Sequence, residues 1–134
     1  MGKSFQDLTV WQRAIDLTVS IYELTAEFPK SETYGLSSQM RRAAVSIASN
    51  IAEGAGRAGK KEFKQFLGMA RGSNCELQTQ LLISSRLSMA SQEQLLKANG
   101  LSQEVGRMLN GLAQSLAEKL KTDKLKTEDS IWQF

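Results

Sequence analysis

The run of residues 34–54 constrains the fold of this chain more than any other segment. Its apolar side chains recur at spacings of three and four residues, which is the pattern of an α-helix with one apolar face. They are Leu36, Met40, Ala43, Ile47 and Ile51. Alanines and serines stand between them, and such small side chains allow another helix to approach closely. The Gly-Ala-Gly sequence at 54–56 is expected to end the helix, because glycine accepts the left-handed conformation of a helix cap.

Three further segments show helical periodicity, and their ends are marked by local signals. The first covers residues 8–28 and stops at Pro29, which cannot continue a helix. The second covers 60–87, and the third covers 91–121, with Ser91 as its N-cap. The chain therefore contains four predicted helices.

Four helices joined by short links predict an all-α, antiparallel up-down-up-down four-helix bundle. We expect one domain over residues 1–121 and a C-terminal tail over 122–134. The Asn99-Gly100 pair leaves open whether the last helix is continuous or consists of two pieces. Gly68 and Gly72, inside the third helix, are interpreted as points of close backbone packing.

The first segment carries two neighbouring apolar stripes. One has the alternating spacing of a heptad seam and consists of Val10, Ala14, Leu17, Ile21, Leu24 and Phe28. The other consists of Trp11, Ile15, Thr18, Tyr22 and Thr25. The sequence favours the simpler interpretation, in which both stripes face one core. The alternative leaves the second stripe for a neighbouring subunit.

The tail loses helical periodicity yet carries apolar residues at Ile131, Trp132 and Phe134. Chain ends fray unless something holds them. Two alternatives therefore stay open, a disordered tail and a tail that docks on this or another subunit.

The 134 residues include no histidine and a single cysteine, Cys75. The usual zinc sites cannot be built without these residues, and the commonest general base is missing. The Glu-x-x-His pairs of di-iron bundles are excluded for the same reason. We therefore expect no enzyme activity, no metal and no cofactor, and we interpret Cys75 as a small packed residue.

No apolar stretch approaches the roughly 20 residues of a membrane span. The first residues lack the apolar core of a secretory signal, and a lone cysteine suits a reducing compartment. The expected location is the cytoplasm, with no membrane partner.

Positive charge is concentrated in one part of the chain. The net charge is +3, and residues 36–76 hold seven basic residues against three acidic ones. The basic residues are Arg41, Arg42, Arg57, Lys60, Lys61, Lys64 and Arg71. This excess indicates an anionic partner, and the hypothesis that follows is nucleic acid, either RNA or DNA. A solvated surface without any partner explains the same charges.

Arg57, Lys60, Lys61 and Lys64 are the strongest candidates for phosphate contact, because they gather near a link between two helices. Such a link lies at one end of a bundle, and repetition around an oligomer axis strengthens weak contacts through multivalency. No aromatic stacking platform accompanies the cluster. A solvated charged end fits the pattern equally well.

Arg41 and Arg42 are adjacent, so they point about 100° apart on a helix. We expect one to pair with a carboxylate across a helix seam and the other to meet solvent or phosphate. Asn50 and Glu53 lie one turn apart on one helix face. The favoured interpretation is a structural clamp, hydrogen-bonded to Arg41, Arg42 or Arg71, and the alternative is a catalytic or ligand-binding carboxylate.

Several motifs together resemble one protein family. They are FQDL at 5–8, VWQRA at 10–14, FP at 28–29, YGL at 34–36, QMRRAAVSI at 39–47 and SNIAEG at 49–54. Shorter matches continue to about residue 87. The pattern resembles the bacterial four-helix-bundle proteins encoded in intervening sequences of large-subunit ribosomal RNA genes. That family includes the accessory variability determinant of diversity-generating retroelements.

The resemblance implies a ring-like homo-oligomer, a pentamer. In the retroelement branch it implies a ring that binds nucleic acid through basic surfaces and partners a reverse transcriptase. The leading hypothesis is therefore a non-enzymatic oligomeric bundle that binds nucleic acid. The alternative is a protein-interaction scaffold that docks a protein partner, such as a reverse transcriptase, without binding nucleic acid itself.

Overall fold

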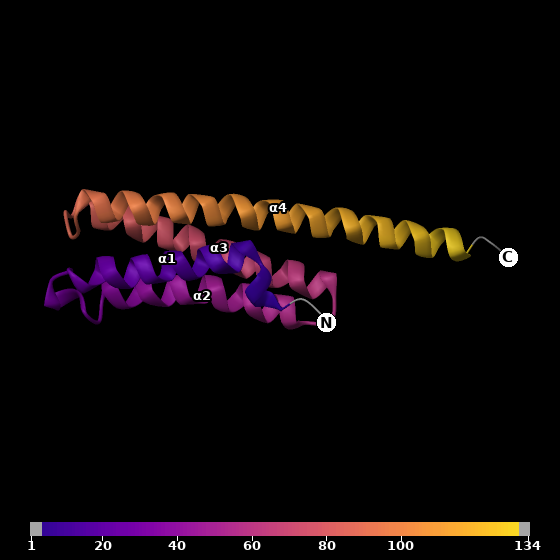
Figure 1. The fold of residues 1–134 in the computed structure, drawn as a ribbon, viewed down its shortest axis with the longest axis horizontal. Helices are drawn as coiled ribbons and strands as arrows, with labels where there is room; N and C mark the ends of the chain where they lie inside the picture. The colour runs from indigo at the N-terminus through magenta and orange to yellow at the C-terminus, as the bar shows by residue number, and fades with distance from the viewer. Residues whose placement is uncertain (1–3, 132–134) are drawn as a thin grey trace.

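The computed structural model describes residues 4–131 and is an antiparallel, up-down-up-down four-helix bundle (Figure 1), which confirms the predicted fold class. The helices are α1 (Thr9–Ala26), α2 (Leu36–Gly56), α3 (Lys60–Arg86) and α4 (Gln92–Ile131). Two short 3-10 helices, η1 (Phe5–Asp7) and η2 (Lys30–Glu32), precede α1 and α2. Each helix packs on the next, and α4 returns against α1 to close the bundle.

The core is formed by the predicted apolar seams. The heptad stripe of α1 is buried throughout, from Val10 to Phe28. The other helices contribute fully buried side chains at Met40, Ile47, Ile51, Leu67, Leu77, Val105 and Leu109. Periodicity alone located these positions, because every helix turns one face to the interior.

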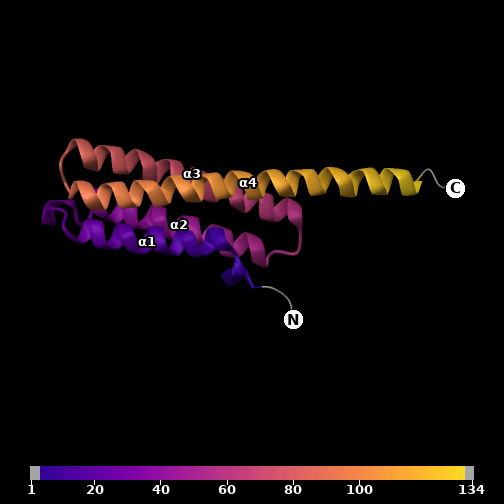
Figure 2. The same ribbon diagram turned by 45° about the horizontal axis from the view of Figure 1, so that its top comes forward.

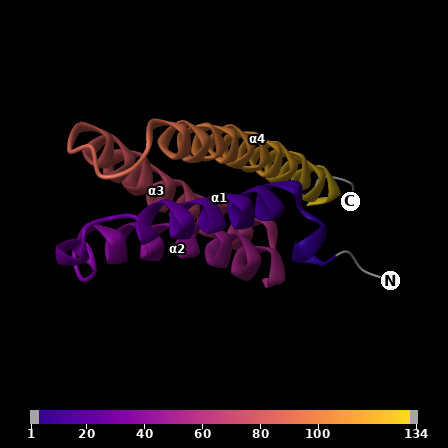
Figure 3. The same cartoon turned by 60° about the vertical axis from the view of Figure 1, so that its left-hand side comes forward.

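The second stripe of α1 shares this core only in part, because Trp11 packs against it and Thr25 is buried. The favoured interpretation, in which both stripes face one core, is therefore wrong for the rest of the stripe. Ile15 and Tyr22 are 37% and 44% exposed, and of this stripe only Thr25 is buried. The reason is geometric, because α2 and α4 are the long helices on which α1 packs, the short η1 adds contacts at its start, and the remaining side of its apolar arc faces none of them. The stripe lies along the outer seam between α1 and α2, which run side by side (Figure 3).

Helix α4 is longer than expected. It runs without interruption through Asn99-Gly100 and continues to Ile131, so the expected end near Lys121 is wrong. Lysine, leucine and glutamate favour the helix beyond that point even though the apolar period is lost. The C-terminal part of α4 projects past the other helices (Figure 2). Trp132 and Phe134, for which docking was an open alternative, lie outside the described residues.

The glycines inside α3 do not make the close contacts that the sequence predicts. A side chain at Gly68 or Gly72 would meet nothing within 4 Å, so these positions are not close contacts. α2 does end at Gly56, yet no glycine among residues 4–131 has a positive φ, and Arg57 caps the helix in an extended conformation. The tight contact is made by Gly54 against α3.

One buried polar pair joins α3 to α4. The Ser102 hydroxyl donates to Asn74 Oδ1 at 2.7 Å, and Asn74 Nδ2 donates to the Ser102 carbonyl oxygen at 3.0 Å. Both side chains are buried away from water, so each depends on the other for its hydrogen bonds.

We expect Ser102→Ala to lower the free energy of unfolding by about 1 kcal/mol, because Asn74 Oδ1 then lacks its donor. Asn74→Ala/Ser102→Ala should cost less than the sum of the two single variants, since it removes both partners together. Urea unfolding measures all three losses. Strictly additive losses would contradict a coupled pair.

Candidate nucleic-acid interface

The structure divides the seven predicted basic residues among three places. Arg41 and Arg42 lie on the first half of α2, and Arg71 lies on α3 beside α4. Arg57, Lys60, Lys61 and Lys64 lie together at the α2–α3 turn. Only the last group forms a cluster, so the seven do not make one continuous basic surface.

The turn cluster follows from where the two helices end and begin. α2 ends at Gly56, and α3 begins at Lys60 after an extended Gly59 that offers no side-chain cap. Lys60 and Lys61 therefore stand in the first turn of α3, at the positive end of the helix dipole. Lysine there is unfavourable for helix stability, whereas an anion is favoured. The arrangement raises the local positive potential at this end of the bundle.

Two of the four cations are held by carboxylates. The Arg57 guanidinium donates to Glu53 at 2.8 Å and lies 5.2 Å from the centroid of the Phe66 ring. Lys60 Nζ donates to Asp123 Oδ2 at 2.8 Å. The hydrogen bond from Lys60, together with the lysine charge, lowers the pKa of Asp123, while the Glu53 hydrogen bond raises the pKa of Arg57. Lys61 and Lys64 are exposed and have no ion pair among the side chains of residues 4–126.

The contact between Lys60 and Asp123 shows that α4 passes this turn. Four lysines, Lys119, Lys121, Lys124 and Lys126, lie within four residues of Asp123, or about 6 Å along the helix axis. Lys124 and Lys126 lie beyond the predicted end of this helix near Lys121, and no local pattern places any of the four lysines beside the α2–α3 turn. The sequence does contain one signal for them, because these lysines recur every two or three residues in a stretch of good helix formers. We call the two groups together the basic end: Arg57, Lys60, Lys61, Lys64, Lys119, Lys121, Lys124 and Lys126.

Arg41 is bound to α1 and not to a carboxylate, so the expectation of a carboxylate partner is wrong for this residue. Its Nε donates to the Thr25 hydroxyl at 2.8 Å, and a terminal nitrogen donates to the Tyr22 carbonyl at 3.4 Å. Its guanidinium lies 4.6 Å from the centroid of the Tyr22 ring. Arg42 is exposed and lines a cavity of about 460 Å³ with Glu76, yet the two form no ion pair in the described structure.

Asn50 and Glu53 do not form the expected clamp. Asn50 Nδ2 donates to the carbonyl and hydroxyl oxygens of Ser46, at 2.8 and 3.0 Å. The Ser46 hydroxyl in turn lies 2.8 Å from that of Ser73 on α3. Glu53 is exposed and pairs with Arg57 one turn onward, in place of Arg41, Arg42 or Arg71. Glu53 lies near the end of α2, and Arg57 follows it four residues later, so Arg57 is its neighbour on the same helix face.

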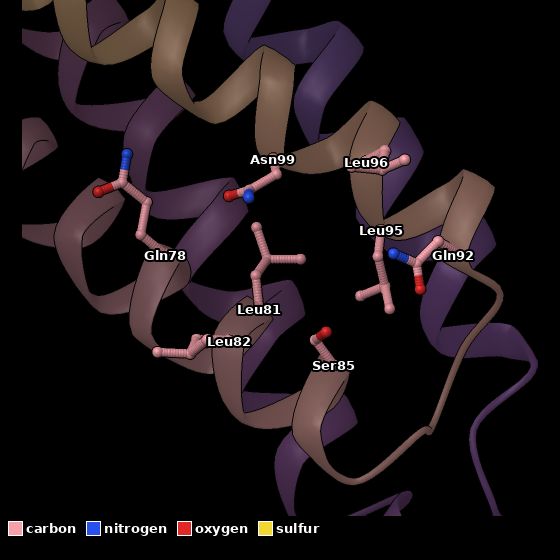
Figure 4. Close-up of a pocket in the computed structure, with 8 residues that line it drawn as sticks. All are labelled: Gln78, Leu81, Leu82, Ser85, Gln92, Leu95, Leu96 and Asn99. Atoms are coloured by element: carbon pink, nitrogen blue, oxygen red, sulfur yellow. The ribbon is translucent and has the colours of Figure 1, made fainter.

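Two other features carry no chemistry of their own. Cys75 is exposed on α3, so its interpretation as a packed residue is wrong. A notch of about 120 Å³ between α3 and α4 is lined by leucines, amides and a hydroxyl, without any charged group (Figure 4). Leu82 and Leu96 at this notch are exposed.

Among residues 4–126, whose side chains the structure describes, no group of three or more His, Cys, Asp or Glu is placed to hold a metal ion. Within the described chain, none of the helices has the length and apolarity needed to cross a membrane.

Comparison with known proteins identifies the family. The sequence model of the 23S rRNA-intervening sequence protein family matches residues 6–111. No curated protein gave a match. A solved structure from Bacteroides thetaiotaomicron, described as a protein with unknown function from the S23 ribosomal protein family, superposes with a TM-score of 0.72 at 23% identity. The match covers 78% of this chain and 95% of that one, and it supports the same fold. With most of its length matched by the family model, this chain belongs to the 23S rRNA-intervening sequence protein family.

Proposed function

We propose that this protein is a non-enzymatic, cytoplasmic homo-oligomer that binds nucleic acid, RNA or DNA, through the basic end. One observation carries the proposal: the contact between Lys60 and Asp123 places the part of α4 that holds these lysines beside the basic turn between α2 and α3. Two helical elements, distant in sequence, thus supply cations to one end of the bundle. The absence of histidine from the sequence supports a binding role over a reaction.

The chemistry of lysine defines the binding mode. An ammonium group on a flexible stem contacts phosphate oxygens as a point charge and reads no base. Binding of this kind is independent of sequence, and it weakens as salt rises because counterions are released. Repetition of the basic end in a ring, a pentamer as the family resemblance implies, multiplies weak contacts into a stable complex.

The proposal is tested by fluorescence anisotropy of labelled structured RNA and duplex DNA with nuclease-treated protein, at low and near-physiological salt. Lys61→Gln/Lys64→Gln/Lys124→Gln removes three exposed cations from the basic end and spares the Lys60–Asp123 contact. We expect about tenfold weaker binding and a salt slope reduced by about 2 to 3 units for duplex DNA.

The matched control removes the same charge from the opposite end of the bundle. Lys30→Gln/Arg86→Gln/Lys97→Gln changes three exposed cations near the α1–α2 and α3–α4 links. This variant should bind within about twofold of the original protein. Equal weakening by both variants would show that binding depends on the net charge of the protein and not on the basic end. Absence of binding at low salt would overturn the proposal.

A second candidate function is a protein-interaction scaffold for a partner such as a reverse transcriptase. It is favoured by the apolar side chains exposed outside the core, among them Ile15, Tyr22 and Leu96. A defined protein partner that stays bound after nuclease treatment, with no nucleic acid in the complex, would support this candidate against the first.

A further inference from the structure

The outer seam between α1 and α2 holds two cavities of different chemistry. One, of about 300 Å³, is lined by aromatic, aliphatic and small side chains, among them Trp11 and Ile15. The other, of about 400 Å³, is lined by two arginines, Arg41 and Arg42, together with hydroxyl-bearing residues. Val45 lines both cavities, so they adjoin each other along α2. We call the two cavities together the outer groove.

Arg41 is held in a fixed position in the cationic half of the outer groove. Hydrogen bonds to the Thr25 hydroxyl and the Tyr22 carbonyl oxygen occupy its Nε and one terminal nitrogen, and the Tyr22 ring lies 4.6 Å from its guanidinium. Its other terminal nitrogen, Nη1, has no partner in the described chain. Neither Arg41 nor Arg42 has an ion pair among the side chains of residues 4–126. A guanidinium that is positioned in advance and lacks a carboxylate is well suited to bind a phosphate oxygen.

The other half of the outer groove offers apolar and aromatic surfaces. Trp11 is half-buried, and Phe5 packs edge-on against it with the ring centroids 5.3 Å apart. Ile15 and Val45 beside them are 37% and 41% exposed. The Thr18 hydroxyl of this lining already donates to backbone carbonyl oxygens of α1 and α2. Such a surface suits the flat face of a nucleobase, because stacking on aromatic rings requires no hydrogen bonds and accepts any base.

The length of the outer groove favours a strand over a single nucleotide. Ser38 and Ala52 line its two ends and lie about 21 Å apart along the axis of α2. A stacked strand covers that length with about six nucleotides, at 3.4 Å per nucleotide. In a duplex the base faces are stacked on one another, whereas an unpaired strand presents base faces and phosphates together. An unpaired strand therefore matches both the length and the two chemistries of the outer groove.

We propose that the outer groove binds an unpaired nucleic-acid strand of about six nucleotides. Phosphate oxygens contact Arg41 and Arg42, and bases lie against Trp11 and Ile15. The inference rests on the proposed function, because it names the form of nucleic acid that the protein selects. It uses residues separate from the basic end, which attracts any polyanion, and the outer groove adds the preference for unpaired nucleotides.

Trp11 fluorescence tests the contact directly. The chain has two tryptophans, so Trp132→Phe leaves Trp11 as the only one. We expect a strand of about twelve nucleotides without self-complementarity to quench this fluorescence in a saturable manner, because a base stacks on the indole ring. The duplex of the same sequence should bind at the basic end and leave the fluorescence nearly unchanged. The protein is full-length, nuclease-treated and in its natural oligomeric state.

An abasic strand of the same length is the matched control ligand. It keeps every phosphate and lacks the bases, so it should bind about tenfold more weakly and should not quench Trp11. Equal affinity for the abasic strand would overturn the proposal. An intact strand that binds by anisotropy without changing Trp11 fluorescence would overturn the outer groove and leave the basic end as the site of binding.

Two arginine variants test the cationic half. Arg42→Gln, at an exposed position, should weaken binding of the unpaired strand about fivefold and binding of the duplex by less than about twofold. Arg71→Gln removes the same charge from an exposed position in the α3–α4 seam, outside the outer groove. It should change both affinities by less than about twofold. Equal effects of the two variants on the unpaired strand would overturn the proposal.

Two acidic variants test the apolar half. Ile15→Glu places a carboxylate in the outer groove and should weaken binding of the unpaired strand about tenfold. Leu96→Glu places the same charge on an exposed leucine at the α3–α4 notch and should cost less than about threefold. Circular dichroism checks that both variants are folded. A loss of strand binding by Leu96→Glu as large as that by Ile15→Glu would overturn the proposal.

The Lys61→Gln/Lys64→Gln/Lys124→Gln variant separates this inference from the proposed function. It should weaken binding of strand and duplex by a similar factor and keep both the preference for the strand and the quenching of Trp11. Loss of that preference would place the recognition of unpaired nucleotides at the basic end and overturn the outer groove. Absence of any binding to the original protein at low salt would overturn both proposals.

Discussion

Leu109→Ala is expected to lower the free energy of unfolding by about 3 kcal/mol, whereas Leu125→Ala is expected to change it by less than about 0.5 kcal/mol. Both leucines are on α4. Leu109 is fully buried, so its truncation removes apolar contacts and leaves a cavity that the packed helices only partly fill. Leu125 is 60% exposed, on the part of α4 beyond Asp123, and its truncation removes little buried surface.

Urea unfolding monitored by circular dichroism at 222 nm measures both changes. Protein concentration must be the same for all variants, because association of copies adds to apparent stability. Hydrogen exchange gives an independent readout, since amides after Asp123 should exchange faster than those near Leu109. A loss of more than about 2 kcal/mol for Leu125→Ala would show that the end of α4 is packed and not projecting.

Gly54→Ala is expected to lower the free energy of unfolding by about 2 kcal/mol. A Cβ atom at Gly54 would lie 2.6 Å from Phe66 Cβ and 3.1 Å from Phe63 Cδ1. Because Phe66 Cβ is fixed by the backbone of α3, the helices must separate, and overpacking of this kind costs about 1 to 3 kcal/mol. The better helix propensity of alanine, about 1 kcal/mol at most, offsets only part of this.

Gly56→Ala is the matched control two residues onward. A Cβ atom there meets nothing within 4 Å, and no positive φ forbids a side chain. We expect this variant to be as stable as the original protein or up to about 1 kcal/mol more stable. If both variants gave the same change, the close approach of α2 and α3 at Gly54 would not be needed for stability.

The basic residues show that closeness in sequence does not predict which side chains form one site. Seven of them are near one another in sequence, but helix geometry sends Arg41 to the side chains of α1 and Arg71 to the seam with α4. Arg57, Lys60, Lys61 and Lys64 stay together because a turn holds them at one end of the bundle. The lysines of α4 join them through Asp123, a contact between residues 63 positions apart that no local pattern contains.

The sequence by itself determined the four helices, their antiparallel order and the side chains of the core. These depend on apolar periodicity, on Pro29 and on short links, all of which act within a few residues. Only the tertiary structure decided that Ile15 and Tyr22 of the second stripe of α1 are exposed, that Gly54 rather than Gly68 or Gly72 makes the close contact, and that α4 passes the basic turn. The physical reason is that the exposure of a residue and the residues it contacts depend on which surfaces of other helices lie near it. The register between helices is set by the packing of the whole bundle.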